Sequence, residues 1–202
     1  GGLNHYQYVP NPTGWVDPLG LSCCPPGGSI DKSPTNTGAG SRYKEIISSI
    51  DGRKVGEYTA LDDGPLSAGA VTRAEQQGSL AATFSGGRYA DMELNSDTVA
   101  YRAWHPGQAR EFGAFWSLEK PAGSLQTRID SALLPEWGKL RGNPLHRQQA
   151  TRYTIVIIPK GTRVYIGEVG TQGGAWVGGG SQMLIKDGAV LPGWKVGEGL
   201  LK

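Results

Sequence analysis

The most apolar stretch of the sequence is residues 153–158, which read Tyr-Thr-Ile-Val-Ile-Ile, a run of strand type. A turn signal, Pro-Lys-Gly, follows at once. Four further strand-like runs occupy residues 88–94, 98–104, 163–166 and 182–185. Because only the polar residues 95–97 separate the first two of these, they are predicted to form a hairpin. The sequence therefore predicts a β-rich core with residues 153–158 as a central strand.

Two short helices are predicted around this core. Residues 43–50 carry apolar side chains with the spacing i, i+3, i+4 and i+7, which is typical of an amphipathic helix. Ser124 is suited to N-cap a second helix, which Pro135 ends and whose shared apolar face is Leu125, Ile129, Ala132 and Leu133. The predicted class is α+β, mostly β with a few short helices.

Glycine is abundant, with 32 residues in 202, and it is concentrated in residues 1–40 and 161–200. Residues 24–40 combine glycine with proline, serine and threonine and have almost no apolar periodicity, which is typical of a linker. The chain is 38% hydrophobic and has six tryptophans, so the rest can bury a core. A domain boundary is expected near residue 40.

Charge and cysteine content exclude several classes of function. Twenty basic and eighteen acidic residues give a net charge of +2, which supplies no broad phosphate-binding field. Cys23 and Cys24 are adjacent, so they form no disulfide scaffold, and three scattered histidines predict no metal site. No apolar run approaches 18 residues, so no membrane contact is expected. Residues 1–8 lack the features of a signal peptide.

Residues 4–21 form an aromatic, proline-punctuated segment that ends in Asp-Pro-Leu-Gly-Leu. This segment closely resembles the one that closes the shell of Rhs/YD-repeat polymorphic toxins, in which a variable C-terminal toxin follows the Asp-Pro-x-Gly-Leu motif. The resemblance implies that residues 1–21 end an Rhs shell, residues 22–40 are a linker and residues 41–202 are the toxin domain. It also implies autoproteolysis, with Asp17 as acid or base and the cut after Leu21.

Arg102 is the first candidate for a functional residue. Strand alternation places it on the face opposite Tyr101 and Ala103, and aromatic residues flank it. Its planar fork of donors suits a phosphate or a ribose hydroxyl. The competing interpretation is a solvated arginine on a strand.

Two further elements have the composition of a ligand site. Phe115 and Trp116, beside Ser117, can form an apolar wall for a flat ring with a hydroxyl at its rim, although such clusters usually belong to a core. The glycine-rich residues 167–180 lead into a strand that begins with Gln182. Since a strand and not a helix follows, this is no nucleotide-phosphate loop, and it is expected to be a mobile loop that presents Gln182.

The arginine on a strand, the aromatic-Ser element and the loop before Gln182 together resemble the three-part pattern of ADP-ribosyltransferases of the diphtheria and cholera toxin kind. The resemblance implies a split two-sheet fold with NAD as the ADP-ribose donor. It implies that Arg102 holds phosphate or ribose, and that Tyr101, Phe115 and Trp116 line the nicotinamide pocket. Ser117 would position Arg102 or the ribose, and Gln182 would bond the ribose 2′-hydroxyl.

Two positions depart from the family pattern. Only Ser117 represents the usual Ser-Thr-Ser motif, and Leu184 stands where the final motif usually has glutamate. A carboxylate from elsewhere could complete the site, with Glu168 held in reserve and Glu111 as a further candidate. His105 could border an NAD cleft, although a histidine before Pro-Gly is more often exposed.

The two resemblances imply an interbacterial Rhs effector, secreted by a type VI system, that transfers ADP-ribose from NAD to an essential target in the recipient's cytoplasm. A protein of the translation machinery is preferred over structured RNA because the only basic cluster is small. A cognate immunity protein is implied as a partner. The alternatives are an NAD glycohydrolase, in which water replaces the acceptor, and a non-catalytic shell or adhesion module.

Overall fold

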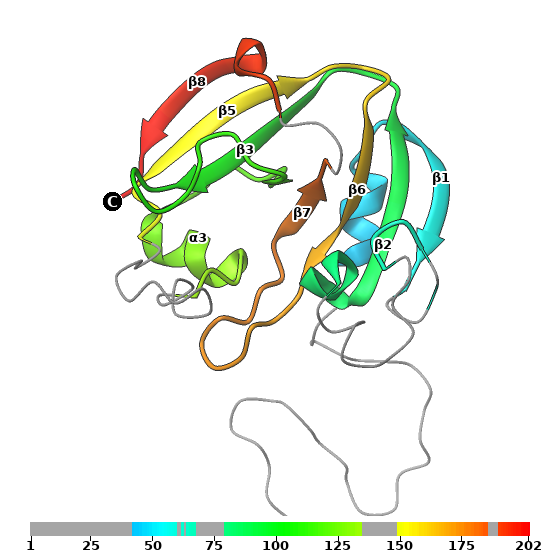
Figure 1. Ribbon diagram of the computed structural model, residues 1–202, viewed down its shortest axis with the longest axis horizontal. Helices are drawn as coiled ribbons and strands as arrows, with labels where there is room; N and C mark the ends of the chain where they lie inside the picture. The colour runs from blue at the N-terminus through cyan, green and yellow to red at the C-terminus, as the bar shows by residue number, and fades with distance from the viewer. Residues whose placement is uncertain (1–41, 60–61, 63, 68–78, 135–148, 186–189) are drawn as a thin grey trace, which may run out of the picture. The chain divides into compact units, whose positions relative to one another are not determined.

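The computed structural model describes residues 42–59, 62, 64–67, 79–134, 149–185 and 190–202. Contacts divide the chain after Gly38, and all described residues belong to the second unit, Ala39–Lys202. This part forms two antiparallel sheets with a few short helices (Figure 1), which confirms the predicted α+β, mostly β class. The predicted Asp-Pro-x-Gly-Leu motif, with Asp17 and Leu21, and the predicted linker lie outside the described residues.

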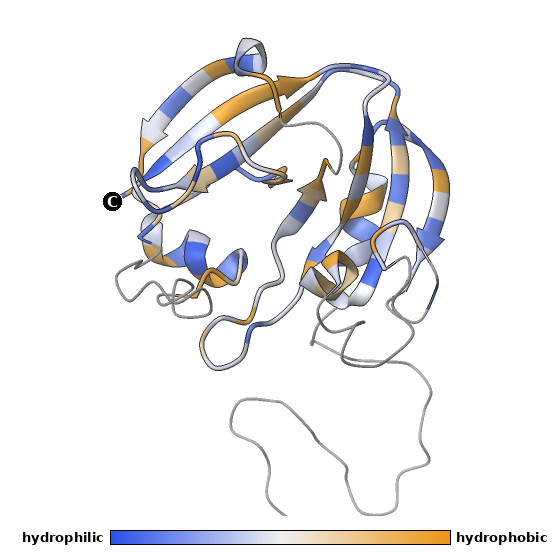
Figure 2. Ribbon diagram, viewed as in Figure 1, coloured by the Kyte–Doolittle hydropathy of each residue, from blue (hydrophilic) through white to orange (hydrophobic). Residues whose placement is uncertain are grey.

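All strand pairs in the two sheets are antiparallel. The larger sheet has the order β1 (Gly52–Tyr58), β2 (Phe84–Leu94), β6 (Arg163–Val169), β7 (Ser181–Leu184) and β4 (Phe115–Trp116). The smaller sheet has the order β3 (Thr98–Trp104), β5 (Arg152–Ile158) and β8 (Lys195–Leu200). The central strand predicted at residues 153–158 is confirmed as β5, and Figure 2 shows its second half in the orange of hydrophobic residues.

The predicted hairpin is wrong. β2 pairs with β1 and β6, and β3 pairs with β5, so residues 95–97 carry the chain from one sheet to the other. The turn between β5 and β6 crosses back beside it: the Gly161 N–H donates to the Leu94 carbonyl at 2.8 Å and the Lys160 N–H to Asp97 Oδ1 at 2.8 Å. Strand alternation shows which face of a strand is buried but does not identify its partner. The two crossings therefore stabilise each other where a hairpin was expected.

The helix predicted from residue 43 is α1 (Tyr43–Ser48), which packs against β6 and buries Tyr43 and Ile46. The second helix is α3 (Ser124–Asp130). Its N-cap is Gly123, and the Ser124 hydroxyl donates to the Gln149 carbonyl, so the predicted cap is wrong. The predicted apolar face is also wrong at Leu125, which is 63% exposed. Two 3-10 turns, η1 (Leu80–Thr83) and η3 (Pro192–Trp194), complete the described helical structure, and none of these helices has the length and apolar character that spanning a membrane requires.

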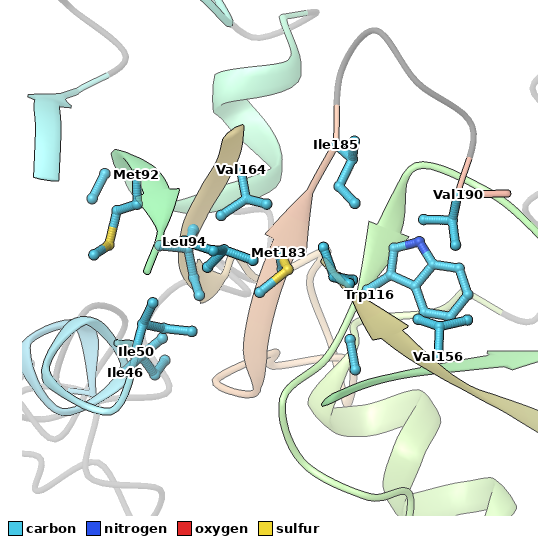
Figure 3. Close-up of a cluster of buried hydrophobic side chains, with 14 of the residues drawn as sticks. Ile46, Ile50, Met92, Leu94, Trp116, Val156, Val164, Met183, Ile185 and Val190 are labelled. Atoms are coloured by element: carbon cyan, nitrogen blue, oxygen red, sulfur yellow. The ribbon is translucent and has the colours of Figure 1, made fainter. Parts of the chain in front are cut away.

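The larger sheet is buried on both faces because alternate side chains of its strands enter two hydrophobic clusters. On β7, Met183 enters one cluster and Leu184 the other. The first cluster extends to the smaller sheet through Val156 and includes Trp116 (Figure 3). The second is built around the aromatic ring of Tyr89, whose centroid lies 5.4 Å from that of Phe84. Packing in these clusters therefore holds β4 through Trp116 and β7 through Met183 and Leu184.

Candidate functional site

A cleft of about 630 Å³ lies where the edges of the two sheets meet, and Arg102, Ser117 and Gln182 all line it. This volume is typical of small-molecule sites, which span about 300–1,000 Å³. The sheets are joined at Tyr101 and Ser117, whose backbones exchange two hydrogen bonds of 2.8 and 2.7 Å; we call this pair the sheet junction. The three residues predicted from separate parts of the sequence are thus brought together by the fold.

Arg102 is half-buried on β3 and holds the segment before β4. Its Nη1 donates to the Phe115 carbonyl at 2.7 Å and its Nε to the Arg110 carbonyl at 3.1 Å. Burial lowers the pKa of Arg102 to about 10, so the group remains charged at neutral pH. Among the described carboxylates, none forms an ion pair with it. An unneutralised, oriented guanidinium on a cleft wall suits an anionic ligand.

Gly113 leaves space for this guanidinium, because a Cβ at that position would lie 2.5 Å from Arg102 Nη2 and 2.6 Å from its Cζ. Gly113→Ala is expected to displace Arg102 and to weaken binding of NAD, the predicted ligand, about tenfold, which equals about 1.4 kcal/mol. Titration calorimetry measures this change. Gly193→Ala is the matched control, since its Cβ would meet nothing within 4 Å. Equal affinities of the two variants would contradict the expectation.

The predicted aromatic wall is divided between cleft and core. Tyr101 and Phe115 are half-buried and line the cleft. Strand alternation places Tyr101 on the face of β3 opposite Arg102. Both residues can line the cleft because β3 is an edge strand. Trp116 also borders the cleft, but it is only 3% exposed, packs in the first cluster and donates its Nε1–H to the Gly113 carbonyl at 2.7 Å. Its main contacts are therefore those of a core residue.

Trp116→Ala is expected to destabilise the fold by about 3–5 kcal/mol, because it removes a large buried side chain and leaves a cavity. Urea unfolding monitored by circular dichroism measures the loss. Leu125→Ala is the control, since that side chain is 63% exposed and should change the free energy of unfolding little. A Trp116→Ala protein as stable as the Leu125→Ala protein would show that Trp116 is not a core residue.

Glu119 is a cleft residue that the sequence reasoning missed. Its Oε2 accepts the hydroxyl of Ser117 at 2.9 Å, the backbone N–H of Ser181 at 3.1 Å and the hydroxyl of Ser181. Its Oε1 accepts Arg42 Nη2 at 3.1 Å. Burial, the largest single effect, opposes ionisation, but these hydrogen bonds and the Arg42 charge together lower the pKa of Glu119 below its ordinary value. The sequence signal that could have identified Glu119 is its position two residues after Ser117.

Gln182 lies near the start of β7, as predicted, and is 7% exposed. Its Nε2 donates to the Thr83 hydroxyl on η1 at 2.7 Å, and both residues line the cleft. This bond fixes the orientation of the side-chain amide. The side chain of Gln182 is thus held by η1, which is outside the strand that carries it.

The reserve acid Glu168, the further candidate Glu111 and His105 are not among the residues that line the cleft. Glu168 is 3% exposed on β6, and its Oε2 accepts the backbone N–H of Arg42 at 2.9 Å. Glu111 accepts Lys195 Nζ at 2.7 Å. The His105 ring pairs through Nδ1 with the Thr151 hydroxyl at 2.7 Å. Among the described residues, the carboxylates that line the cleft are those of Glu119 and Asp130.

The glycine-rich segment before β7, which was predicted to be a mobile loop that presents Gln182, is hydrogen-bonded to α3 where it approaches β7. Gly178 and Gly180 donate their N–H groups to the Ile129 and Asp130 carbonyls of α3, at 3.0 and 3.1 Å. Gly178 has φ +75°, and a Cβ there would lie 2.5 Å from the Val169 carbonyl oxygen. The Arg128 guanidinium lies 4.6 Å from the ring centroid of Trp176. The segment therefore follows α3 closely on its way to Gln182.

Comparison with known proteins gives little further information. No family model matches the chain, and no curated protein matches it. A solved structure described as "Structure of Tne2 in complex with Tni2" is similar at a TM-score of 0.43 and 16% identity, covering 56% of this chain and 92% of that one. Among the described residues, no group of three or more His, Cys, Asp or Glu side chains could hold a metal ion.

Proposed function

We propose that this chain carries an ADP-ribosyltransferase toxin domain that uses NAD as its ADP-ribose donor. The observation that carries the proposal is the presence of Arg102, Ser117 and Gln182 in one cleft at the sheet junction. These residues come from β3, the residue after β4, and β7, which is the order of the three-part pattern. The Arg102 guanidinium, which has no ion pair with a described carboxylate, provides a place for the NAD diphosphate.

The chemistry follows from the bond that breaks. When the N-glycosidic bond of NAD is cleaved, its electron pair goes to nicotinamide, which leaves neutral, and the ribose becomes oxocarbenium-like. An acceptor nucleophile then bonds to ribose C1′ and loses a proton. Arg102 holds the diphosphate, and Tyr101 and Phe115 pack against nicotinamide. Gln182 bonds the ribose 2′-hydroxyl, a contact that strengthens in such transition states.

The proposed biological role is that of an interbacterial Rhs effector, exported by type VI secretion and active in the cytoplasm of the recipient. Its proposed target is a protein of the translation machinery. A cognate immunity protein protects the producing cell, and covering the cleft would be enough to exclude NAD. These assignments rest on the resemblance of residues 4–21 to the Rhs shell segment.

The test is incubation of the purified protein with NAD labelled in its adenylate part and a bacterial lysate. Label that is bound to macromolecules and lost on protease treatment supports transfer to a protein. Label that is lost on RNase treatment instead assigns the acceptor to RNA. Free ADP-ribose without labelled macromolecules would assign the cleft to NAD hydrolysis, and unchanged NAD would overturn the proposal.

A further inference from the structure

We propose that Glu119 is a positioning residue that fixes the start of β7 and so places Gln182 for the reaction; this inference rests on the proposed function. Glu119 follows β4, and Gln182 is the second residue of β7. The carboxylate binds both serines that flank this point, Ser117 and Ser181. We call the contacts among Glu119, Ser117 and Ser181 the carboxylate clasp.

The clasp replaces strand pairing at the place where the pairing ends. β4 pairs with β7 at Phe115↔Leu184 and Trp116↔Met183. Ser117 then turns its backbone to Tyr101 at the sheet junction. On the β4 side of β7, the backbone N–H of Ser181 therefore meets the Glu119 carboxylate at 3.1 Å in place of a strand carbonyl. The Ser181 hydroxyl accepts the Leu118 N–H at 2.8 Å and closes the clasp.

The segment that precedes Ser181 is ordered through its bonds to other elements and not by its own residue types. Residues 178–180 are three consecutive glycines, the residue type with the greatest backbone freedom. Gly178 and Gly180 donate to α3, and Gly179 and Gly180 also bond to Val169 of β6. Ser181 and Gln182 pair with β6 on one side of β7, and the clasp holds Ser181 from the other side, so a change in the clasp acts on the residue next to Gln182.

The hydrogen bonds of Glu119 indicate positioning and not proton transfer. Oε2 receives three donors from Ser117 and Ser181, and Oε1 receives Arg42. A carboxylate has about four acceptor positions, so these donors occupy the group. The lowered pKa keeps Glu119 ionised, which favours acceptance and opposes protonation. Glutamine at this position would place an N–H₂ group against donors.

The first arm of the test is a double-mutant cycle on nicotinamide release from NAD. Glu119→Gln is expected to lower kcat about tenfold while KM changes by less than about threefold, because Arg102 is held independently. In a Gln182→Ala background, Glu119→Gln is expected to change kcat by less than about twofold, since its effect passes through Gln182. Equal losses in both backgrounds would overturn the positioning role.

The matched control is Glu45→Gln. Glu45 also contacts Arg42, at 3.5 Å, but its side chain is 71% exposed and does not line the cleft. Nicotinamide release by this variant is expected to equal that of the wild type. A loss as large as that of Glu119→Gln would show that the Arg42 environment in general, and not the carboxylate clasp, is responsible.

The second arm does not depend on catalysis. Amide hydrogen exchange at Ser181 and Leu118 is expected to accelerate at least about tenfold in Glu119→Gln, because both N–H groups depend on the clasp. Unchanged exchange at both would overturn the clasp, whatever the activity. If the wild-type protein does not cleave NAD but Glu119→Gln shows this acceleration, the proposed function is overturned and the clasp is supported.

Discussion

Arg102→Ala is expected to lower kcat/KM for NAD cleavage by at least about 100-fold, because charge-assisted hydrogen bonds contribute about 1.5–3 kcal/mol each. The loss should appear mainly as weaker NAD binding, since the guanidinium lines the cleft and has no described carboxylate partner. Nicotinamide release and titration calorimetry measure the two effects. Arg102→Lys is expected to be almost as defective, because one ammonium group cannot reproduce the bonds to the Arg110 and Phe115 carbonyls.

The control for Arg102 is Arg53→Ala on the edge strand β1. Arg53 is 65% exposed at its side chain and is paired with Glu93. Removing it also deletes one positive charge, so it separates a local contact from a change in net charge. If the two variants lose NAD affinity equally, the assignment of Arg102 to the diphosphate is wrong.

Gln182→Ala is expected to lower kcat by about 100-fold with a smaller change in KM, because a contact that forms fully only in the transition state affects kcat. The variant should also leave the Thr83 hydroxyl without its partner amide at 2.7 Å. Steady-state kinetics of nicotinamide release, with thermal unfolding to confirm folding, measure the outcome.

The control for Gln182 is Gln126→Ala on α3, where an exposed amide donates to Asp130 at 2.7 Å. It should retain wild-type kinetics. A Gln182→Ala protein that retains both kcat and toxicity would remove Gln182 from the site and would direct attention to Glu119 and Asp130, the described acids of the cleft.

The sequence predicted secondary structure best where the residue pattern of a segment agrees with its place in the fold. The run at residues 153–158 became β5, and the spacing from Tyr43 to Ile50 identified α1. The positions of Arg102, Ser117 and Gln182 in one cleft also followed from the resemblance to the three-part pattern. For β5 and α1 the side-chain pattern of one segment contained the required information, and for the cleft the order of three segments along the chain did.

The failures concern relations between segments. Residues 95–97 have the composition of a hairpin turn, but the crossing depends on bonds from Gly161 and Lys160, more than sixty residues away in the chain. Ser124 has the residue type of an N-cap, yet its hydroxyl is bonded to Gln149. Glu119 was missed for the same reason, because its partners Arg42 and Ser181 are distant in sequence. Composition cannot show which distant groups a side chain will meet.

Arg42 is among the described residues that set how far the protein can be shortened. Its backbone N–H binds the buried Glu168 at 2.9 Å, and its guanidinium binds the Gly179 carbonyl and Glu119, both at 3.1 Å. A fragment that starts at residue 43 would remove the backbone donor to the buried Glu168 carboxylate and the guanidinium donor to Glu119, and so would weaken the contacts of this end of the domain with β6 and with the cleft. Recombinant fragments should therefore begin before residue 42, and a fusion partner or tag needs its spacer on the far side of that residue.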